Sequence, residues 1–471
     1  MSKLSTVNNL LQFSLTLNNS PESNMPENTS AIDIEKLTSL CKRRGFVFQS
    51  SEIYGGLAST WDYGPLGVEL KRNVKDSWWK TMVWERDDMV GLDAAILMHP
   101  DTWRASGHLE NFTDPLVECS DCNKRFREDH IDSVTCPDCG GKLSDPRLFH
   151  LMFKTHMGPV EEEAAIVYFR PETAQGIFVN FNNVVTSTRK KLPFGIAQVG
   201  KSFRNEITTG NFIFRTREFE MMEIEYFVMP GEDEKVHQKW MQDCMDWYTN
   251  IGVKPENLRL RKHEDEELSH YAKATYDIEY NFPWGWGEIQ GIANRTDFDL
   301  KAHMAMSGEK LTYFDEVSGQ HVIPYVIEPS LGVDRAVMTL LVDAYTEEET
   351  TAASGKTETR VLLKLDPSVA PVKVAVLPLS RNERLAPLAK SVYDDVRKNR
   401  LIEGNVQFDD AQSIGRRYRR QDEIGTPLCV TVDFDSIDDG CVTIRERDSM
   451  DQKRVSITNL AQEISSLLIG D

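Results

Sequence analysis

The chain has 471 residues, of which 40% are hydrophobic, and it carries a formal net charge of −20 at pH 7. A chain of this length is expected to form two or three domains, and no apolar run approaches the length of a bilayer span. The acidic balance argues against general nucleic-acid binding unless a local basic surface is present, because phosphate contacts need positive charge.

The first 30 residues are rich in Ser, Asn and Pro and show no sustained periodicity, which predicts a disordered tail. They have neither the features of a secretory signal nor the arginines of an organelle presequence. The cysteines form two C-x-x-C pairs and four scattered residues, a pattern that suits reduced thiols rather than a disulfide framework. We therefore expect a cytoplasmic protein.

Helical periodicity starts at Ile32 and stops at Gly45, which is a typical helix-ending residue. A longer helix is predicted from Val68 to about Trp84, and residues 87–100 read as a strand. If this helix has no role at an interface, it is an ordinary amphipathic helix whose tryptophans are buried in the core.

Two C-x-x-C pairs separated by 13 residues lie within residues 115–150. The four residues are Cys119, Cys122, Cys136 and Cys139. This spacing puts four thiolates on two turns and predicts a tetrahedral zinc site without an open position, so its role would be structural. The alternative is a set of four free cysteines. We expect a zinc-ribbon-like insertion here.

Residues 201–227 alternate apolar and charged side chains on both sides of a polar turn, which predicts two antiparallel strands joined by a loop. Arg204 and Arg215 flank the loop, and Phe219 follows it. Guanidinium groups beside an aromatic ring suit a bound triphosphate and a flat base. The alternative is a solvated hairpin with cross-strand ion pairs.

The second half of the chain shows three further patterns. Residues 231–280 begin with apolar residues at helical spacing, so we expect a helical insertion. Residues 347–360 read as a polar linker, and their Gly355-Lys356-Thr357 lacks the earlier glycine of a phosphate-binding loop.

From residue 370, strands alternate with helices, which indicates a parallel or mixed sheet. Four arginines within residues 416–420 are the candidate basic surface, or else a solvated helix face.

Three separated stretches resemble motifs of the class II aminoacyl-tRNA synthetases. Residues 203–206 with Arg215 and Phe219 resemble motif 2, and residues 328–335, EPSLGVDR, resemble motif 3. Residues 169–181, FRPETAQGIFVNF, resemble a signature of the dimeric glycyl-tRNA synthetases. The resemblance runs from about Leu37 to the C-terminus.

The resemblance implies an α+β catalytic domain with an antiparallel sheet over residues 31–365, and a C-terminal α/β anticodon-binding domain over residues 370–471. The helix at 68–84 and the strand after it resemble motif 1, which lies at a dimer interface in this class. The implied activity is the activation of glycine with ATP to glycyl-adenylate, followed by transfer of glycine to the 3′ end of tRNA(Gly). Attack of free ATP on the adenylate, giving diadenosine polyphosphate, is an available side reaction.

The implied partners are ATP, glycine, tRNA(Gly) and a second copy of the chain, with Mg²⁺ accompanying ATP and Zn²⁺ at the cysteines. The competing interpretation is a non-catalytic, synthetase-like accessory protein that binds nucleic acid, and such a protein would lose the phosphate-binding arginines. Arg204, Arg335 and Glu288 are the implied catalytic residues, and Glu288 is also the implied Mg²⁺ ligand.

The resemblance also assigns the residues of the two small-molecule sites. The implied glycine-binding residues are Arg104, Glu172, Phe219, Glu220, Met221, Met222, Glu223, Glu328, Pro329, Ser330, Leu331 and Gly332. The implied ATP-binding residues are Arg204, Asn205, Glu206, Phe214, Arg215, Thr216, Arg217, Glu218, Phe219, Glu288, Ile289, Gly332, Val333, Asp334 and Arg335. Taken alone, Arg104 could equally form a surface ion pair and Glu172 a structural one.

Overall fold

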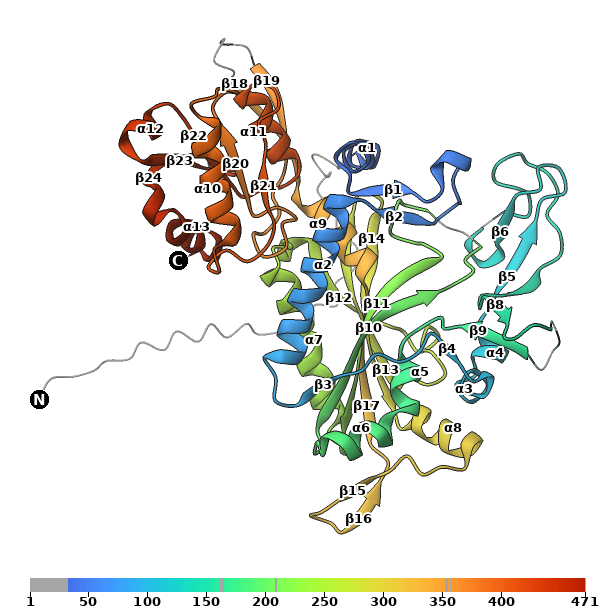
Figure 1. The fold of residues 1–471 in the computed structure, drawn as a ribbon. Coiled ribbons are helices and arrows are strands. Elements are labelled where there is room, and N and C mark those ends of the chain that lie inside the picture. Colours follow the sequence, from blue (N-terminus) through green and yellow to red (C-terminus); the bar gives the residue numbers. More distant parts are fainter. Residues whose placement is uncertain are drawn as a thin grey trace, which may run out of the picture.

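The computed structural model describes residues 33–470 except 132, 161, 163, 164, 208, 209, 352–354 and 356. The tail expected over residues 1–30 lies outside the described residues. Among the described residues, none of the helices is both long and apolar enough to cross a membrane. Figure 1 shows a larger N-terminal part built on one sheet and a smaller C-terminal part beside it.

A seven-stranded sheet forms the centre of the larger part. Its strands, in spatial order, are β12(Leu258–Lys262), β13(Ala274–Phe282), β14(Gly285–Thr296), β17(Tyr325–Gly332), β11(Glu218–Val228), β10(Phe194–Phe203) and β3(Met89–Gly91). Every neighbouring pair is antiparallel except β3 with β10. The predicted antiparallel sheet and the hairpin predicted over residues 201–227, now β10 and β11, are both confirmed.

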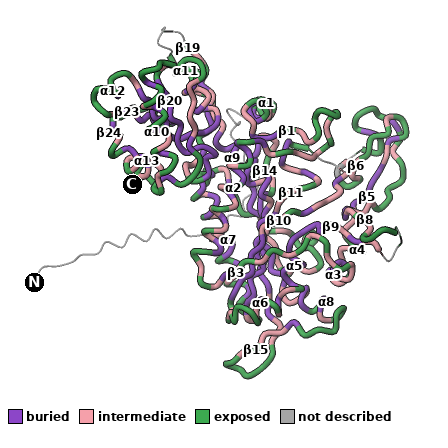
Figure 2. Tube along the Cα trace, viewed as in Figure 1, coloured by how far each residue is buried: buried purple, intermediate pink, exposed green. Residues whose placement is uncertain are grey.

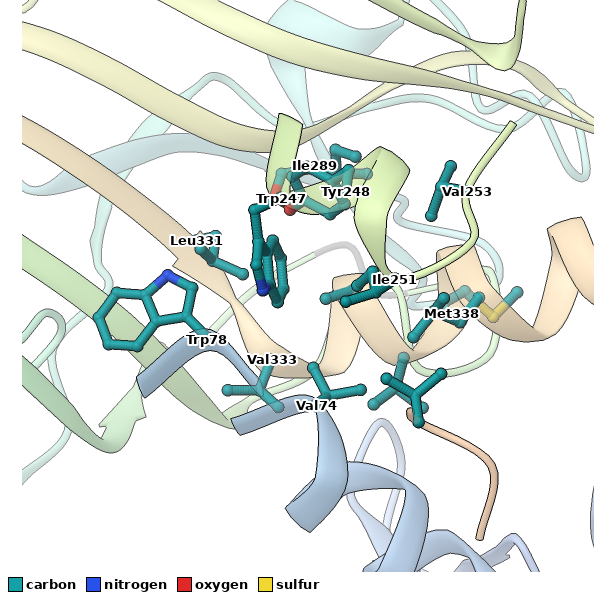
Figure 3. Packing of buried hydrophobic residues seen from close by; sticks show 14 of the residues in the cluster. Val74, Trp78, Trp247, Tyr248, Ile251, Val253, Ile289, Leu331, Val333 and Met338 are labelled. Atoms are coloured by element: carbon teal, nitrogen blue, oxygen red, sulfur yellow. Dashed lines mark hydrogen bonds between the residues drawn. The ribbon is translucent and has the colours of Figure 1, made fainter. Parts of the chain in front are cut away.

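Three helices cover one face of this sheet: α2(Pro65–Trp79), which continues as the π-helical turn Lys80–Trp84, α7(Asp233–Asn250) and α9(Val333–Ala344). Alternate residues of β11 point to this face because side chains along a strand change sides at every step. Met222, Ile224 and Tyr226 join the buried cluster beneath the helices. Figure 3 shows Trp78, Trp247 and Met338 among the side chains that fill it, and Figure 2 shows the continuous buried zone.

The opposite face of the sheet is only partly covered. The helices α5(Ala174–Val179), α6(Phe181–Thr188) and α8(Phe298–Ser307) pack on it through an apolar cluster that includes Phe227 and Val326. Further along the same face, β11 presents Glu223 and Glu225 instead of apolar side chains. The sheet therefore has one apolar face and one face that changes from apolar to acidic.

Three predictions about elements of the larger part were wrong. The helix expected at the start of residues 231–280 is present as α7, but the rest of this range is not a helical insertion, because the chain then returns as β12 and β13 of the main sheet. Residues 87–100 form two short strands, β3 and β4(Leu97–Met98), rather than one. Residues 347–360 are no linker but most of a hairpin, β18(Tyr345–Thr351) and β19(Thr357–Leu363), whose threonines suit extended backbone.

The cysteine-containing insertion and the remaining elements surround this sheet. The insertion contains β5(Thr113–Glu118), β6(Arg125–Arg127) and β7(Arg147–His150) as a three-stranded sheet. The other elements of the larger part are α1(Ile34–Arg44), β1(Val47–Gln49), β2(Trp61–Tyr63), α3(Pro100–Ala105), α4(His108–Asn111), β8(Lys154–His156), β9(Ile166–Phe169), β15(Tyr313–Asp315), β16(Gln320–Val322) and the 3-10 turns Glu52–Tyr54, Glu128–His130 and Pro255–Asn257. Gly45 ends α1 in the left-handed conformation, as predicted.

The smaller part has a mixed five-stranded sheet, which confirms the alternation read from the sequence. Its strands, in spatial order, are β21(Val406–Phe408), β20(Val374–Pro378), β22(Leu428–Val432), β23(Cys441–Glu446) and β24(Gln452–Ser456). The first three are parallel and the last two pair antiparallel. Its helices are α10(Ala386–Lys398), α11(Ile414–Glu423), α12(Asp435–Asp439), the 3-10 turn Ile457–Asn459 and α13(Leu460–Ile469).

The arginines at 416–420 do not form a basic surface, and the alternative of a solvated face is also wrong for most of them. Arg417 is 1% exposed and donates to backbone carbonyls next to β20. Arg420 pairs with Asp409 at 2.6 Å, and Arg419 pairs with Glu358 of β19. Arg417 and Arg420 attach α11 to its own sheet and Arg419 attaches it to the β18–β19 hairpin, whereas Arg416 is exposed and the Arg419 side chain is 43% exposed.

Replacing Met338 by alanine is expected to lower the free energy of unfolding by about 2–5 kcal/mol, because the truncated side chain leaves a cavity in the core. Met338 is fully buried on α9, whereas Met306 on α8 is 48% exposed. The control, Met306→Ala, should cost less than about 0.5 kcal/mol. Urea unfolding followed by tryptophan fluorescence measures both, and equal losses would contradict the position of α9 in the core.

Candidate active site

A cavity of about 350 Å³ opens on the acidic half of the sheet's less covered face. Its walls come from β11, β13, β14, β17 and the start of α9, together with the loop between β10 and β11. Strand register explains why distant segments meet here. Glu223 of β11 pairs with Ser330 of β17, Ser330 pairs with Gly291 of β14, and Gly291 pairs with Asp277 of β13. Directly paired residues share a face, so this row forms the floor of the cavity.

One end of the cavity is cationic and aromatic. The Arg335 guanidinium lies 4.6 Å from the centre of the Phe214 ring, and Arg335 Nη1 donates to the Glu288 carbonyl at 2.7 Å. The same Nη1 is 3.3 Å from the Glu288 carboxylate, and this guanidinium lowers the pKa of Glu288. The Glu288 side chain is half exposed and ionised, so its oxygens are available to a ligand in the cavity.

Two more arginines line the same end. The Arg204 guanidinium lies 5.4 Å from the Phe219 ring centre, and its Nε donates to the Pro171 carbonyl at 3.1 Å. Arg215 Nε lies 3.1 Å from the carboxylate of the buried Glu206. These contacts hold the guanidinium groups over the cavity and leave donors unused, as a phosphate-binding end requires.

The other end of the cavity is acidic. Glu172, between β9 and α5, lies with Oε2 3.2 Å from His108 Nε2 and accepts a hydrogen bond from Gln175 Nε2 at 3.0 Å. Burial opposes ionisation of Glu172, but His108 and then Arg295 outweigh it and lower the pKa of this carboxyl. Glu172 is therefore a carboxylate inside a nearly closed site.

Glu223 forms the second acidic wall and is held from both sides. The Thr173 N–H donates to its Oε2 at 2.8 Å, the Thr173 hydroxyl donates to the same oxygen, and Ser330 Oγ donates to its Oε1 at 2.7 Å. Burial and then the nearby Glu172 raise the pKa of Glu223. A cation placed between Glu172 and Glu223 would relieve this repulsion.

Arg295 is the buried cation behind these acids, at 1% exposure. Its Nε and Nη2 donate to Asp299 at 2.7 and 2.8 Å, and Nη1 donates to Glu328 at 2.7 Å. Its guanidinium also stacks 3.8 Å from the centre of the Tyr271 ring. Burial and then the repulsion from Glu223 and Glu172 raise the pKa of Glu328 to about 8, against the attraction of Arg295.

The structure brings most of the predicted site residues together. Those that line the cavity are Glu172, Arg204, Glu206, Phe214, Arg215, Thr216, Phe219, Met221, Glu223, Glu288, Ile289, Glu328, Ser330, Leu331, Gly332, Asp334 and Arg335. The predicted residues that do not line it are Arg104, Asn205, Arg217, Glu218, Glu220, Met222, Pro329 and Val333. Met222 and Val333 face the helix-covered side of the sheet.

Three of these outlying residues have other partners. Glu220 pairs with Lys75 at 2.8 Å, and Arg217 donates to the Glu206 and Ala58 carbonyls. Arg104 is exposed on α3 and pairs with Asp101, one helical turn earlier, which is the surface ion pair kept as its alternative.

Sequence reasoning missed several residues that build the acidic end. His108 contacts Glu172, Arg295 contacts Glu328 and stacks on Tyr271, and Asp277 lines the cavity from β13. The spacing of Arg295 and Asp299, four apart, was the available signal for the buried pair. No local pattern points to His108, because its partner Glu172 lies 64 positions along the chain.

The four cysteines of the C-x-x-C pairs meet in the insertion, and their sulfurs all lie within 4.8 Å of one another. Cys119 Sγ is 3.5 Å from Cys139 Sγ, and Cys122 Sγ is 3.7 Å from Cys136 Sγ. Each pair spans a tight turn, closed by Asn123 N–H on the Cys119 carbonyl and by Gly140 N–H on the Cys136 carbonyl. Backbone N–H groups lower the pKa of the Cys119 thiol to about 7.

Comparison with known proteins identifies both parts of the chain. Residues 153–345 match the tRNA synthetase class II core domain (G, H, P, S and T), and residues 373–467 match the anticodon binding domain. A crystal structure of prolyl-tRNA synthetase from Cryptosporidium parvum, complexed with halofuginone and AMPPNP, is similar in fold. Its TM-score is 0.64 at 15% identity, over 92% of this chain and 75% of that one.

Curated relatives are much closer in sequence. A glycine–tRNA ligase from Thermobifida fusca is 55% identical over 458 residues, covering 93% of this chain and 98% of the relative. Glycine–tRNA ligases from Streptomyces coelicolor and Caldanaerobacter subterraneus are 54% and 53% identical, covering 94% and 93% of this chain and 100% and 99% of the relatives. At this identity and coverage the chain belongs to the glycine–tRNA ligase family, with a class II synthetase core.

Proposed function

We propose that the protein activates glycine with ATP and transfers the glycyl group to the 3′ end of tRNA(Gly). One observation carries this proposal: a single cavity joins three guanidinium groups at one end to an acid-walled space at the other. The first end suits a triphosphate and the second suits an ammonium group. An amino acid bound beside ATP, the pair that reacts to give an aminoacyl-adenylate and pyrophosphate, presents both features.

In the first step, a glycine carboxylate oxygen attacks the α-phosphorus of ATP. A new O–P bond forms, and the bond to the β-phosphate breaks with its electron pair on pyrophosphate. The carboxylate is already ionised, so the protein supplies position and charge neutralisation rather than a base. We assign Arg204 to the α-phosphate and Arg215 and Arg335 to the β and γ end. We assign Phe219 to stacking on the adenine ring.

The Mg²⁺ that accompanies ATP fits the residues at this end. Glu288 presents an ionised, half-exposed carboxylate to the cavity, and Asp277 is a second carboxyl on its wall. Carboxylate oxygens and substrate phosphates are the ligands that Mg²⁺ prefers. When bound, the ion neutralises phosphate charge, and Glu288 is the residue that would hold it.

In the second step, the 3′-terminal ribose hydroxyl of tRNA attacks the glycyl carbonyl, and AMP leaves. We assign tRNA binding in part to residues 370–471, with residues 31–365 as the catalytic domain. The same adenylate would react with a free ATP to give diadenosine polyphosphate as a side product. The expected setting is the cytoplasm.

Selectivity for glycine follows from the acidic walls. Glu172 and Glu223 approach the ammonium site from opposite sides, each fixed by hydrogen bonds from Gln175, Thr173 or Ser330. Fixed side chains leave no space beside the substrate Cα, and this steric exclusion is needed because binding alone separates analogues that differ by one methylene by only about 1–3 kcal/mol.

The competing interpretation, a non-catalytic accessory protein, has less support. Such a protein has no use for a phosphate-binding end, yet Arg204, Arg215 and Arg335 converge on one cavity with Glu288.

We further propose that the four cysteines hold a structural Zn²⁺. In a tetrahedral site with Zn–S bonds of about 2.3 Å, sulfurs lie about 3.8 Å apart. The separations of 3.5 and 3.7 Å fit this geometry before any ion is added. The cysteines are remote from the cavity walls, so the ion would order the insertion and take no part in the reaction.

The protein is also proposed to work as a homodimer. The helix that resembles motif 1 ends in Trp84, whose side chain is 73% exposed, and it carries Val68 at 50% exposure. A partner that packed along this helix would cover both of these exposed apolar side chains.

Glycine-dependent exchange of pyrophosphate into ATP tests the proposed activity across a panel of amino acids, and only glycine should support it. Glu172→Gln should raise the KM for glycine about thirtyfold or more, because neutralising one side of a buried charge pair costs about 2–5 kcal/mol. The KM for ATP should stay unchanged. Glu110→Gln, an exposed acid on α4, is the control. Equal activation of alanine, or an unaffected Glu172→Gln enzyme, would refute the pocket assignment.

Metal analysis of the purified protein is expected to find about one zinc ion per chain, bound by four thiolates. Cys136→Ser should remove the zinc and lower the melting temperature, whereas Cys441→Ser, outside the cluster, should do neither. If the unmodified protein contained no more zinc than the Cys136→Ser variant, the site would be disproved.

Sedimentation at micromolar concentration should show a dimer. Trp84→Glu should shift it to monomer, because a buried charge without a partner opposes association. Leu148→Glu places the same charge on an equally exposed site in the insertion, at 77% exposure, and should remain dimeric. A monomeric unmodified protein would contradict the interface.

A further inference from the structure

Glu225 has no role in the mechanism above, although it lies beside the amino-acid end of the cavity. Its side chain is fully buried, more so than Glu172, Glu223 or Glu328. Neither of its carboxyl oxygens receives a hydrogen bond from any described residue. A buried polar group without partners is costly and needs an explanation.

Strand register places Glu225 against a second acid. On either side of this position, Glu223 pairs with Ser330 and Tyr226 pairs with Ile327, so Glu225 stands opposite Glu328. One carboxyl oxygen from each of Glu223, Glu225 and Glu328 can be chosen so that the three lie within 4.8 Å of one another. Two ionised carboxylates directly across a strand pair repel each other.

The surroundings of Glu225 disfavour its charged form. Its neighbour across β10 is Ile196, and the next residue of β11 on the same face is Phe227, both members of the apolar cluster under α5 and α8. Burial and then the charge of Glu328 raise the pKa of Glu225 well above its usual range. An ionised carboxylate here would have no donor to stabilise it.

The other charged groups that face Glu225 are already committed. Arg295 of β14 directs three of its five N–H donors to Asp299 of α8 and to Glu328, and it makes no hydrogen bond to either oxygen of Glu225. Both oxygens of Glu223 accept hydrogen bonds from Thr173 and Ser330. Glu328 is different, because Arg295 occupies its Oε1 and no described residue donates to its second oxygen.

We propose that Glu225 carries a proton in the working enzyme and donates a hydrogen bond to the second oxygen of Glu328, which makes it a positioning residue for the carboxylate beside the glycine ammonium. Carboxylates can only accept hydrogen bonds, so this single proton satisfies both acids at once. It also locks the Glu328 side chain, which therefore cannot move aside for a substrate methyl group. The inference rests on the proposed function and refines its selectivity for glycine.

Two variants separate this role from its rivals. Glu225→Gln keeps the shape, the neutral charge and a donor aimed at Glu328, so glycine-dependent pyrophosphate exchange should stay close to the unmodified rate. Glu225→Met keeps the volume but has no donor. Its KM for glycine should rise about ten- to a hundredfold, the effect of a lost hydrogen bond to a charged group, while kcat and the KM for ATP stay the same. The rate with alanine relative to glycine should increase.

The opposite results would overturn the proposal. If Glu225→Gln is impaired as severely as Glu225→Met, Glu225 acts as an ionised carboxylate that binds the ammonium. If both variants match the unmodified enzyme, Glu225 only fills space. An unmodified enzyme without glycine-dependent exchange would refute the proposed function instead.

Infrared spectroscopy gives a readout that needs neither activity nor a folded methionine variant. At neutral pH the unmodified protein should show the carbonyl absorption of protonated carboxyl groups, and Glu225→Gln should lose the contribution of one such group. A spectrum without any such difference between the two proteins would refute the protonated state of Glu225.

Discussion

The site depends on several carboxyl groups that are buried around the guanidinium of Arg295. Arg295 holds Asp299 and Glu328 with three hydrogen bonds and lowers the pKa of Glu172 from a distance. Burial, and then repulsion from neighbouring acids, raises the pKa of both Glu223 and Glu328. In the proposed function, the ammonium group of glycine supplies positive charge to these acids, so substrate binding would relieve their repulsion.

The antiparallel sheet makes this arrangement possible because one face packs against helices and the other face carries the site. One face is sealed by α2, α7 and α9, and its apolar side chains give the sheet a rigid support. On the other face, paired positions on four adjacent strands bring Glu223, Ser330, Gly291 and Asp277 into one row. Groups on a rigid sheet keep their positions while charge develops in the reaction, which is the condition for electrostatic catalysis.

Charged residues serve a different purpose outside the cavity. In the C-terminal part, Asp422 is buried between Arg360 of the β18–β19 hairpin and Arg445 of β23, at 2.8 and 2.9 Å. Arg417 is buried against backbone carbonyls. Three of the four arginines in the run that suggests nucleic-acid binding therefore have partners within the protein: Arg417 and Arg420 inside this domain, and Arg419 on the β18–β19 hairpin.

The sequence alone determined what depends on local spacing. The hairpin of β10 and β11, the two cysteine turns, the mixed sheet after residue 370 and the motifs around Glu172, Arg204 and Arg335 all follow from patterns a few residues long. Only the tertiary structure decided which residues meet across strands. His108 lies beside Glu172, whereas Arg104 pairs with Asp101 on the surface. Residues 258–262 and 274–282 are strands of the main sheet, and Glu225 lies opposite Glu328. These contacts join segments far apart in the chain, and their strength comes from burial and strand register, which no local pattern records.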